Sequence, residues 1–352
     1  MVEVERSGHT RRMTVEALRS LPKAELHLHI EGTLEPELAF ELARRNGVTL
    51  PFASVEDLRL RYDFDDLQSF LDLYYACMAV LRTADDFRDL ALAYLERAHA
   101  DGVRHAELFF DPQVHAGNGV SVDAVMDGLL EGLRIAGERF GMTGGLILCF
   151  LRDLPAASAM ETLESVAGRA GDLLGVGLDS AEVGHPPVLF ADVFARAAEL
   201  GLRLVAHAGE EGPAAYVREA LDTLHVERID HGIRAAEDDA LVEELARRRV
   251  PLTVCPLSNV RLKAVPDLAA HPLRRLFDAG VVVTLNSDDP AYFGGYVAAN
   301  FAAVAGEGFT VDELATMARN SIVASFAPDG RKAELLAELD AWVADSVEMP
   351  RP

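Results

Sequence analysis

The chain is poor in cysteine, and this scarcity excludes one class of protein. It has 3 cysteines among 352 residues, Cys77, Cys149 and Cys255, and no Cys-x-x-Cys pair. So few cysteines, so widely spaced, exclude a disulfide-framed secreted domain and favour reduced thiols in a cytoplasmic protein. Because each cysteine stands in an apolar stretch, we expect all of them to be small buried core residues.

Positive charge is also scarce. The chain has 33 Lys and Arg against 57 Asp and Glu, for a formal net charge of −24. A protein this acidic repels phosphate backbones and anionic lipids, so neither nucleic acid nor a membrane surface is an expected partner. No run of about eighteen uncharged apolar residues predicts a membrane span. The polar first residues lack the apolar segment of a signal peptide.

No low-complexity tract or long Pro/Gly/Ser linker divides the chain. Half of the residues are hydrophobic, which is enough for one large core. We therefore expect a single domain over residues 14–346, between flexible tails at residues 1–13 and 347–352.

Short apolar runs alternate with helical stretches along this domain. The runs are continuously apolar, as is typical of strands that are buried on both faces of a parallel sheet. They are Ala24–Ile30, Val103–Phe110, Gly145–Leu151, Gly175–Asp179, Arg203–His207, Arg228–Asp230, Pro251–Cys255 and Val281–Asn286. Strands that are each followed by a helix predict an α/β fold of the (β/α)8 TIM-barrel type. The segment between the first two runs is too long for one crossover, so we expect extra helices over the barrel mouth.

The most informative feature is the His-Leu-His triplet at the end of the first run. Residues i and i+2 of a strand point to the same face, so His27 and His29 share one. His207 ends the fifth run, His231 follows the sixth, and Asp288 and Asp289 follow the eighth. The working residues of a parallel barrel lie at the C-terminal ends of its strands. The two imidazoles of the first run, a third imidazole and a carboxylate therefore predict a site for a divalent metal, of which zinc fits best.

Two further observations refine the metal site. Many metallohydrolase barrels hold a second metal with a lysine at the end of strand four, and the segment GLDSAEVGHPP has none. A single ion is therefore expected. Another group of histidines is expected to be ordinary core or surface residues: His9, His99, His105, His115, His225 and His271.

Several segments together resemble the adenosine/adenine deaminase family of the amidohydrolase superfamily. They are LPKAELHLHIEGTL, GLDSAEVGHPP, AHAGEEG, ERIDHG, PLTVCPLSN and TLNSDDPAYFGG, and they follow the family's order between Leu21 and Phe326. The resemblance implies one Zn²⁺ per chain, held by His27, His29, His207 and Asp288. A 6-aminopurine is the implied small-molecule substrate, and a homo-oligomer is possible.

The resemblance also implies a catalytic set of Glu210, His231 and Asp288. Glu210 matches the family's proton donor, His231 the histidine beside the water on the metal, and Asp289 the residue that grips the purine. Zinc lowers the pKa of a water molecule toward neutrality, and His231 could orient that water or take its proton. Attack on C6 moves charge onto N1, where a glutamic acid kept neutral by burial can deliver its proton.

Two departures from the adenosine enzymes bear on the substrate. Glu31 stands where those enzymes carry an aspartate that helps bind the sugar, and Glu182 where they carry a glycine that serves the purine edge. Free adenine has an N9–H that a nucleoside lacks, so we hypothesise that Glu182 accepts from the five-membered ring. Gly209, next to the proton donor, completes the expected substrate-binding set. The prediction is conversion of adenine to hypoxanthine and ammonia in purine salvage.

The sequence leaves several alternatives open. The same machinery would convert adenosine to inosine, and a barrel could also bind a purine or a metal without turnover. An amidohydrolase acting on a cyclic amide would have favoured the bridging lysine. The other zinc type of nucleobase deaminase needs His-x-Glu with Pro-Cys-x-x-Cys, of which only His105-Ala-Glu107 is present. The aromatic segment YDFDDLQSFLDLYY could form a lid, although helix packing explains such a stripe equally well.

Overall fold

The computed structural model describes residues 15–64 and 66–348. The expected N-terminal tail lies outside the described residues, and so do residues 349–352 of the expected C-terminal tail. The last helix, α17 (Asp329–Glu348), continues past residue 346, where we expected the domain to end.

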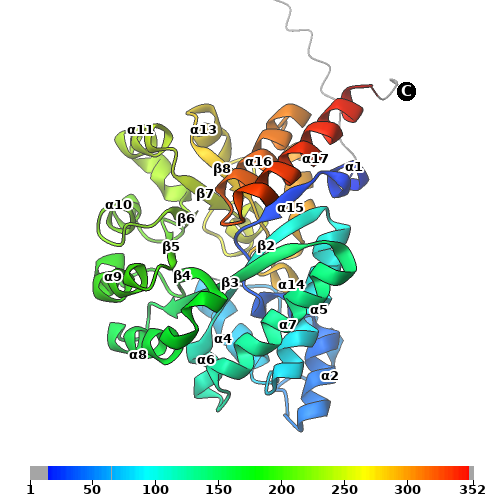
Figure 1. The fold of residues 1–352 in the computed structure, drawn as a ribbon, viewed down its shortest axis with the longest axis vertical. Helices are drawn as coiled ribbons and strands as arrows, with labels where there is room; N and C mark the ends of the chain where they lie inside the picture. Colours follow the sequence, from blue (N-terminus) through cyan, green and yellow to red (C-terminus); the bar gives the residue numbers. More distant parts are fainter. Residues whose placement is uncertain (1–14, 65, 349–352) are drawn as a thin grey trace, which may run out of the picture.

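Eight parallel strands follow one another around a barrel in the order of the chain (Figure 1). They are β1 (Lys23–Glu25), β2 (Val103–Phe110), β3 (Thr143–Leu151), β4 (Leu173–Asp179), β5 (Arg203–Ala208), β6 (Arg228–His231), β7 (Pro251–Val254) and β8 (Val282–Leu285). Almost all of their side chains are buried, as expected for a parallel sheet with its outer face covered by helices. The predicted (β/α)8 barrel is confirmed.

The first strand is shorter than the sequence predicts, because β1 ends at Glu25. Beyond it, the chain stays extended beside the segment that follows β8. The His29 N–H donates to the Asp288 carbonyl at 3.1 Å, and the Asp288 N–H donates to the His27 carbonyl at 3.1 Å. These bonds join the first and last strands, and they bring the His-Leu-His triplet next to Asp288.

Helices surround the strands as an outer ring (Figure 1). The α-helices between β2 and α17 are α6 (Pro112–Gly117), α7 (Val122–Phe140), α8 (Ala156–Val166), α9 (Ala191–Glu199), α10 (Ala214–Asp222), α11 (Asp239–Arg248), α12 (Pro256–Arg261), α13 (Leu273–Asp278), α14 (Pro290–Phe293), α15 (Val297–Gly306) and α16 (Val311–Ala324). Short 3-10 turns are η1 (Glu31–Thr33), η2 (Ala167–Asp172), η3 (Pro187–Phe190) and η4 (Ile233–Glu237). The ring covers the apolar outer face of the barrel.

The long connection between β1 and β2 forms extra helices, as expected. They are α2 (Pro36–Asn46), α3 (Val55–Arg59), α4 (Leu67–Met78) and α5 (Ala84–Ala100). A capping box starts α4, in which the Asp66 carboxylate accepts from the Ser69 N–H at 2.8 Å. Helix α4 carries part of the aromatic segment and lies over the site described below.

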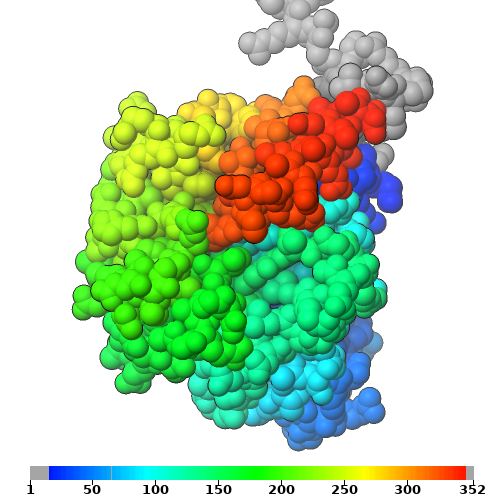
Figure 2. Space-filling model, viewed as in Figure 1, coloured from blue at the N-terminus to red at the C-terminus, as the bar shows by residue number. Residues whose placement is uncertain are grey.

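Both ends of the described chain pack at the end of the barrel where the strands begin, opposite the end that carries the site described below. The Arg331 guanidinium of α17 donates to the Gly141 carbonyl, just before β3, at 2.9 Å. Trp342 of α17 donates to the Ser20 hydroxyl of α1 (Val15–Ser20) at 2.9 Å. Figure 2 shows α17, in red, lying against segments from the first half of the chain. The terminal helices therefore do not cover the C-terminal ends of the strands, where the site lies.

Two composition-based expectations can be compared with the structure. All three cysteines are free and buried, as predicted. Among the helices of the described residues, none has the length and apolarity needed to cross a membrane.

Candidate active site

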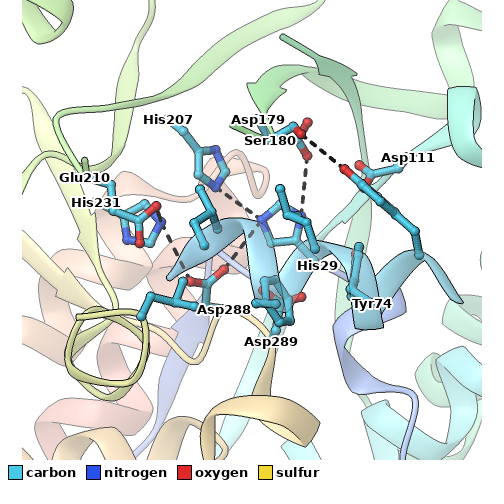
Figure 3. A pocket seen from close by; sticks show the side chains of 15 residues that line it. His29, Tyr74, Asp111, Asp179, Ser180, His207, Glu210, His231, Asp288 and Asp289 are labelled. Carbon is cyan, nitrogen blue, oxygen red and sulfur yellow. Dashed lines mark hydrogen bonds and ion pairs between the residues drawn. The ribbon is translucent and has the colours of Figure 1, made fainter. Parts of the chain in front are cut away.

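The four predicted metal ligands meet at the C-terminal end of the barrel. Figure 3 shows three of them, His29, His207 and Asp288. The Asp288 Oδ1 lies 3.3 Å from His27 Nε2 and 3.5 Å from His29 Nε2. The His29 and His207 Nε2 atoms are 3.2 Å apart. One ligand atom from each residue lies within 4.8 Å of all the others, and all four residues are buried.

The other ring nitrogen of each histidine faces an acceptor, which turns its Nε2 toward this meeting point. The acceptors are the Thr253 carbonyl for His27 (3.2 Å), the Asp179 carboxylate for His29 (3.5 Å) and the Asp230 carboxylate for His207 (3.8 Å). The Nε2 of His27 is buried with no hydrogen-bond partner among the described residues. Imidazole Nε2 atoms that converge on one carboxylate fit a metal ion.

The charges of the set also suit a metal. Burial lowers the pKa of His29 to about 4 and that of His207 well below its usual range, so both rings are neutral, as ligands must be. Burial alone would raise the pKa of Asp288, but the His27, His231 and His29 rings together hold that pKa well below the usual range. Burial alone would lower the pKa of His27, but Asp288, Asp230 and the Thr253 carbonyl together raise it. The neutral rings of His29 and His207 and the Asp288 carboxylate can bind zinc directly, and His27 would release its proton as zinc binds.

A competing ligand set includes Cys255, which lies close to His27, His231 and Asp288. Burial raises the pKa of the Cys255 thiol well above its usual range. A thiol must lose its proton to bind a metal, so this set is the weaker one.

Two residues of the site have a left-handed backbone that only glycine adopts easily. The φ angles are 64° at Asp288 and 59° at His231. Such strain is found at functional sites, where the surrounding fold holds it. Here it aims both side chains inward from the ends of β8 and β6.

Glu210 and His231 stand together beside the ligand set. Glu210 Oε2 lies 3.4 Å from His231 Nε2, and the Asn259 amide donates to Glu210 Oε1 at 3.3 Å. Burial, and then the charge of Asp288, raises the pKa of Glu210 well above its usual range. Glu210 is therefore a neutral acid in position to give up a proton.

Asp289 is a second buried carboxyl group with a raised pKa. Burial is the main cause, and the charge of the adjacent Asp288 adds to it. The Asp289 Oδ1 has no hydrogen-bond partner among the described residues, and the side chain lines the central cavity. A neutral Asp289 offers an O–H donor to a ligand.

These groups line a cavity at the C-terminal end of the barrel. Helix α4 forms one wall of the cavity with Leu67, Phe70, Leu71, Tyr74 and Tyr75. The aromatic segment that could form a lid therefore does lie over the site, and its apolar and aromatic side chains suit a flat heterocycle.

Glu182 has a different role from the one expected. Its Oε1 accepts from the Gly209 N–H at 2.6 Å, and its Oε2 accepts from the Glu210, Glu211 and Gly212 N–H groups at 3.0, 2.9 and 2.8 Å. The side chain is buried and does not line the cavity. We therefore correct the hypothesis that it contacts the purine: the turn after β5 has already occupied both oxygens.

Glu31 and Gly209 also differ from the expectation of substrate contact, because neither lines the cavity. The Glu31 Oε1 accepts from the Asp111 N–H at 3.1 Å and contacts His115 Nε2 at 2.7 Å. The Gly209 N–H donates to Glu182, and the φ of 73° at Gly209 explains why this position is a glycine. Both residues hold neighbouring backbone in place.

Several residues near the cavity were missed from the sequence. Asp111, Asp179 and Ser180 line it, directly after β2 or at the end of β4. The strand-end rule that identified the ligands could have found them. Asn259 was only part of a matching segment, and His271, expected to be ordinary, contacts the Asn259 Oδ1 through Nε2 at 3.1 Å.

The fold and the site together define a class of protein. A (β/α)8 barrel whose strand ends carry three histidines and an aspartate beside a neutral glutamic acid has the arrangement of a metal-dependent hydrolase.

Comparison with known proteins identifies the family. The adenosine deaminase family model matches residues 22–342 of the chain. A relative from Streptomyces coelicolor named adenine deaminase is 62% identical over 330 residues, covering 93% of this chain and 97% of the relative. An adenine deaminase of Caulobacter vibrioides is 56% identical over 332 residues, covering 94% of this chain and 96% of the relative. The chain belongs to the adenosine deaminase family.

Solved structures agree with this assignment. The crystal structure of adenine deaminase from Arthrobacter aurescens matches with a TM-score of 0.91 and 57% identity, covering 92% of this chain and 99% of that one. An amidohydrolase from Burkholderia ambifaria, crystallised with bound Zn, matches with a TM-score of 0.87 and 29% identity, covering 98% of each chain.

Proposed function

We propose that this protein is a zinc-dependent hydrolase that converts adenine and water to hypoxanthine and ammonia. The observation that carries the proposal is the neutral, buried Glu210 beside the three-histidine, one-aspartate ligand set. The relatives named adenine deaminase support adenine, rather than adenosine, as the substrate. A barrel that only binds a purine would have no need of a buried acid beside a metal site.

One zinc ion per chain would be held by His27, His29, His207 and Asp288. When bound, zinc supplies a Lewis acid that lowers the pKa of a water molecule toward neutrality. The unpartnered Nε2 of His27 supports this assignment, as does the Zn in the related amidohydrolase structure.

Glu210 is the proton donor of the proposed reaction. Attack on C6 of adenine moves negative charge onto N1, and a neutral carboxyl group delivers its proton there most readily. Burial keeps that proton on Glu210, and the four N–H groups that bind Glu182 fix the turn that carries it. Glu210 thus acts as a positioned acid.

The hydrogen bonds around His231 decide which of its nitrogens carries a proton. His271 Nδ1 accepts from the Leu273 N–H at 3.0 Å, so its Nε2–H donates to the Asn259 Oδ1 at 3.1 Å. The Asn259 NH2 must then face His231 Nδ1, at 3.1 Å, and donate to it. A neutral His231 therefore carries its proton on Nε2, toward Glu210, and orients the attacking water as a donor.

Asp289 would bind N7 of the substrate. The main tautomer of adenine has its proton on N9, so N7 is an acceptor and pairs with the O–H of a neutral Asp289. The aromatic wall of α4 covers the purine and excludes bulk water, which strengthens these polar contacts. The acidic net charge supports a small purine, rather than nucleic acid, as the partner. The cytoplasmic location and a homo-oligomer stay predictions.

The test uses the zinc-loaded protein, with ammonia release and the ultraviolet change from adenine to hypoxanthine as readouts. We expect Glu210→Gln to lower kcat by about 10²- to 10⁴-fold with its zinc content unchanged. Glu211→Gln is the matched control and should keep native activity, because Glu211 is only half-buried. The proposal fails if the native protein, with zinc bound, releases no ammonia from adenine, or if Glu210→Gln is as fast as the native protein.

A further inference from the structure

The cavity has an acidic side that the proposed reaction does not use. Asp111, Asp179 and Ser180 line it on the side of His29 away from Glu210 and His231 (Figure 3). Asp179 contacts His29 Nδ1, and Ser180 contacts the Tyr75 hydroxyl at 3.1 Å. Asp111 remains without an assigned role.

The fold makes little use of the Asp111 carboxyl group. Asp111 precedes α6, but its side chain makes no capping hydrogen bond to that helix. The residue is 2% exposed, and its Oδ1 makes no hydrogen bond of ordinary geometry among the described residues. The carboxyl group does lie beside that of Asp179, with which it shares a hydrogen-bonding contact, and near a ring nitrogen of His29. Leaving a buried polar oxygen unpaired is costly, so such an atom at a cavity wall points to a ligand that supplies the partner.

The orientation of the proposed substrate indicates which of its groups would pair with the Asp111 carboxyl oxygen. With C6 at the metal ligands, N1 at Glu210 and N7 at Asp289, the N3–C4–N9 edge of adenine lies at the far end of the molecule. This edge presents an acceptor, N3, and a donor, N9–H. Asp111 lies across the cavity from Glu210, on the side that this edge would face (Figure 3).

We propose that Asp111 is the specificity-determining residue that reads the N9–H of a free purine base, which donates to the Asp111 carboxyl oxygen. This inference rests on the proposed function and identifies how the site would distinguish a base from a nucleoside. Adenosine has no N9–H, so it leaves the carboxyl group unpaired and brings a sugar against it. Sites built to pair a buried polar group reject ligands that lack the partner.

The protonation of Asp111 is consistent with this contact. Burial, followed by the charges of Asp179 and Glu31, raises the pKa of Asp111 well above its usual range. A neutral carboxyl group has a C=O that accepts from N9–H and an O–H that donates to N3, so it matches both positions of the edge.

The experiment changes both partners of this contact. The substrates are adenine and an adenine analogue with an oxygen in place of N9–H, and the variants are Asp111→Leu and Asp111→Asn. We expect the native protein to prefer adenine over the analogue by about 10²-fold in kcat/KM. Asp111→Leu should reduce this preference to near unity while still releasing ammonia from the analogue. Asp111→Asn, which keeps an acceptor and a donor, should restore most of the preference.

The outcomes separate this inference from the proposed function. Turnover of adenine by the native protein tests the function alone. If adenine is deaminated but the native protein does not distinguish the two substrates, or if Asp111→Leu keeps the native preference, the role of Asp111 is overturned. If Asp111→Leu does not fold, the native preference and its retention in Asp111→Asn decide the question, and loss of the preference in Asp111→Asn counts against the proposal.

Discussion

The position of Asp289 depends on the close approach of the backbone at Gly32. A Cβ atom on Gly32 would lie 1.9 Å from the Asp289 Oδ1 and 2.7 Å from its Cα, so only glycine allows this approach. The carboxyl group that we assign to N7 of the purine is therefore positioned by a residue that never touches the substrate.

Gly32→Ala should displace Asp289 and weaken substrate binding. We expect kcat/KM for adenine to fall by about 10- to 10²-fold, mostly through KM, with zinc content unchanged. Gly168→Ala is the control, because a Cβ there would have no neighbour within 4 Å. Unchanged kinetics in Gly32→Ala would contradict the claim that substrate binding depends on the position of Asp289.

Single residues differ in how well the sequence predicts them. That the candidate ligands lie together follows from a general rule, since the C-terminal ends of parallel strands converge. The resemblance selects four of them, and the structure brings these four together. Glu182 could not be predicted in the same way. Its partners are the N–H groups of a turn 27 to 30 residues further along the chain, and the path of that turn is not visible in the local pattern.

Among the elements, the turn after β5 is the one on which the proposed chemistry most depends. It carries Glu210, and its four N–H groups all donate to the Glu182 carboxylate, which follows β4. A carboxylate that accepts this many bonds fixes the turn as firmly as a helix cap fixes a helix end.

Glu182→Gln should loosen this turn, because its NH2 group cannot accept from the N–H groups. We expect a loss of about 1–3 kcal/mol in the free energy of unfolding and a lower kcat, since Glu210 shifts from its place. Denaturant unfolding and steady-state rates measure both effects. Glu161→Gln, on the surface of α8, is the control and should match the native protein. A native kcat in Glu182→Gln would contradict this role for Glu182.

Most strands could be located from continuous apolar runs, because both faces of these strands are buried. The exception is β1, which ends early because the chain after Glu25 pairs only through isolated bridges. Periodicity cannot detect this difference, since Leu26, Leu28 and Ile30 are as buried as strand residues. The extra helices were predicted from the length of the β1–β2 connection alone.

On the scale of the whole molecule, the barrel end opposite the site contains a buried lysine. The Lys23 Nζ donates to the Leu18 carbonyl at 3.1 Å and the Asp101 carbonyl at 2.5 Å. Burial lowers the pKa of Lys23 to about 7, although the Asp101 carboxylate acts in the opposite direction. Stability should therefore depend on pH through this residue.

Between about pH 7 and pH 10.5 the unfolded chain binds a proton at Lys23 that the folded chain does not. The free energy of unfolding should then rise with pH, by up to about 1.4 kcal/mol per unit, relative to Lys23→Met. Below pH 7 both states are protonated and the difference is constant. Denaturant unfolding of both proteins from pH 6 to pH 10 measures it, and parallel profiles would show that Lys23 stays charged when folded.

The central claim is that the zinc-loaded site deaminates the free base in preference to the nucleoside. Equal concentrations of adenine and adenosine in one reaction measure this directly, because the initial ratio of hypoxanthine to inosine is the ratio of the two kcat/KM values. We predict that hypoxanthine forms first and that inosine accumulates only slowly. Predominant formation of inosine, or the absence of both products with the zinc site filled, would contradict the account.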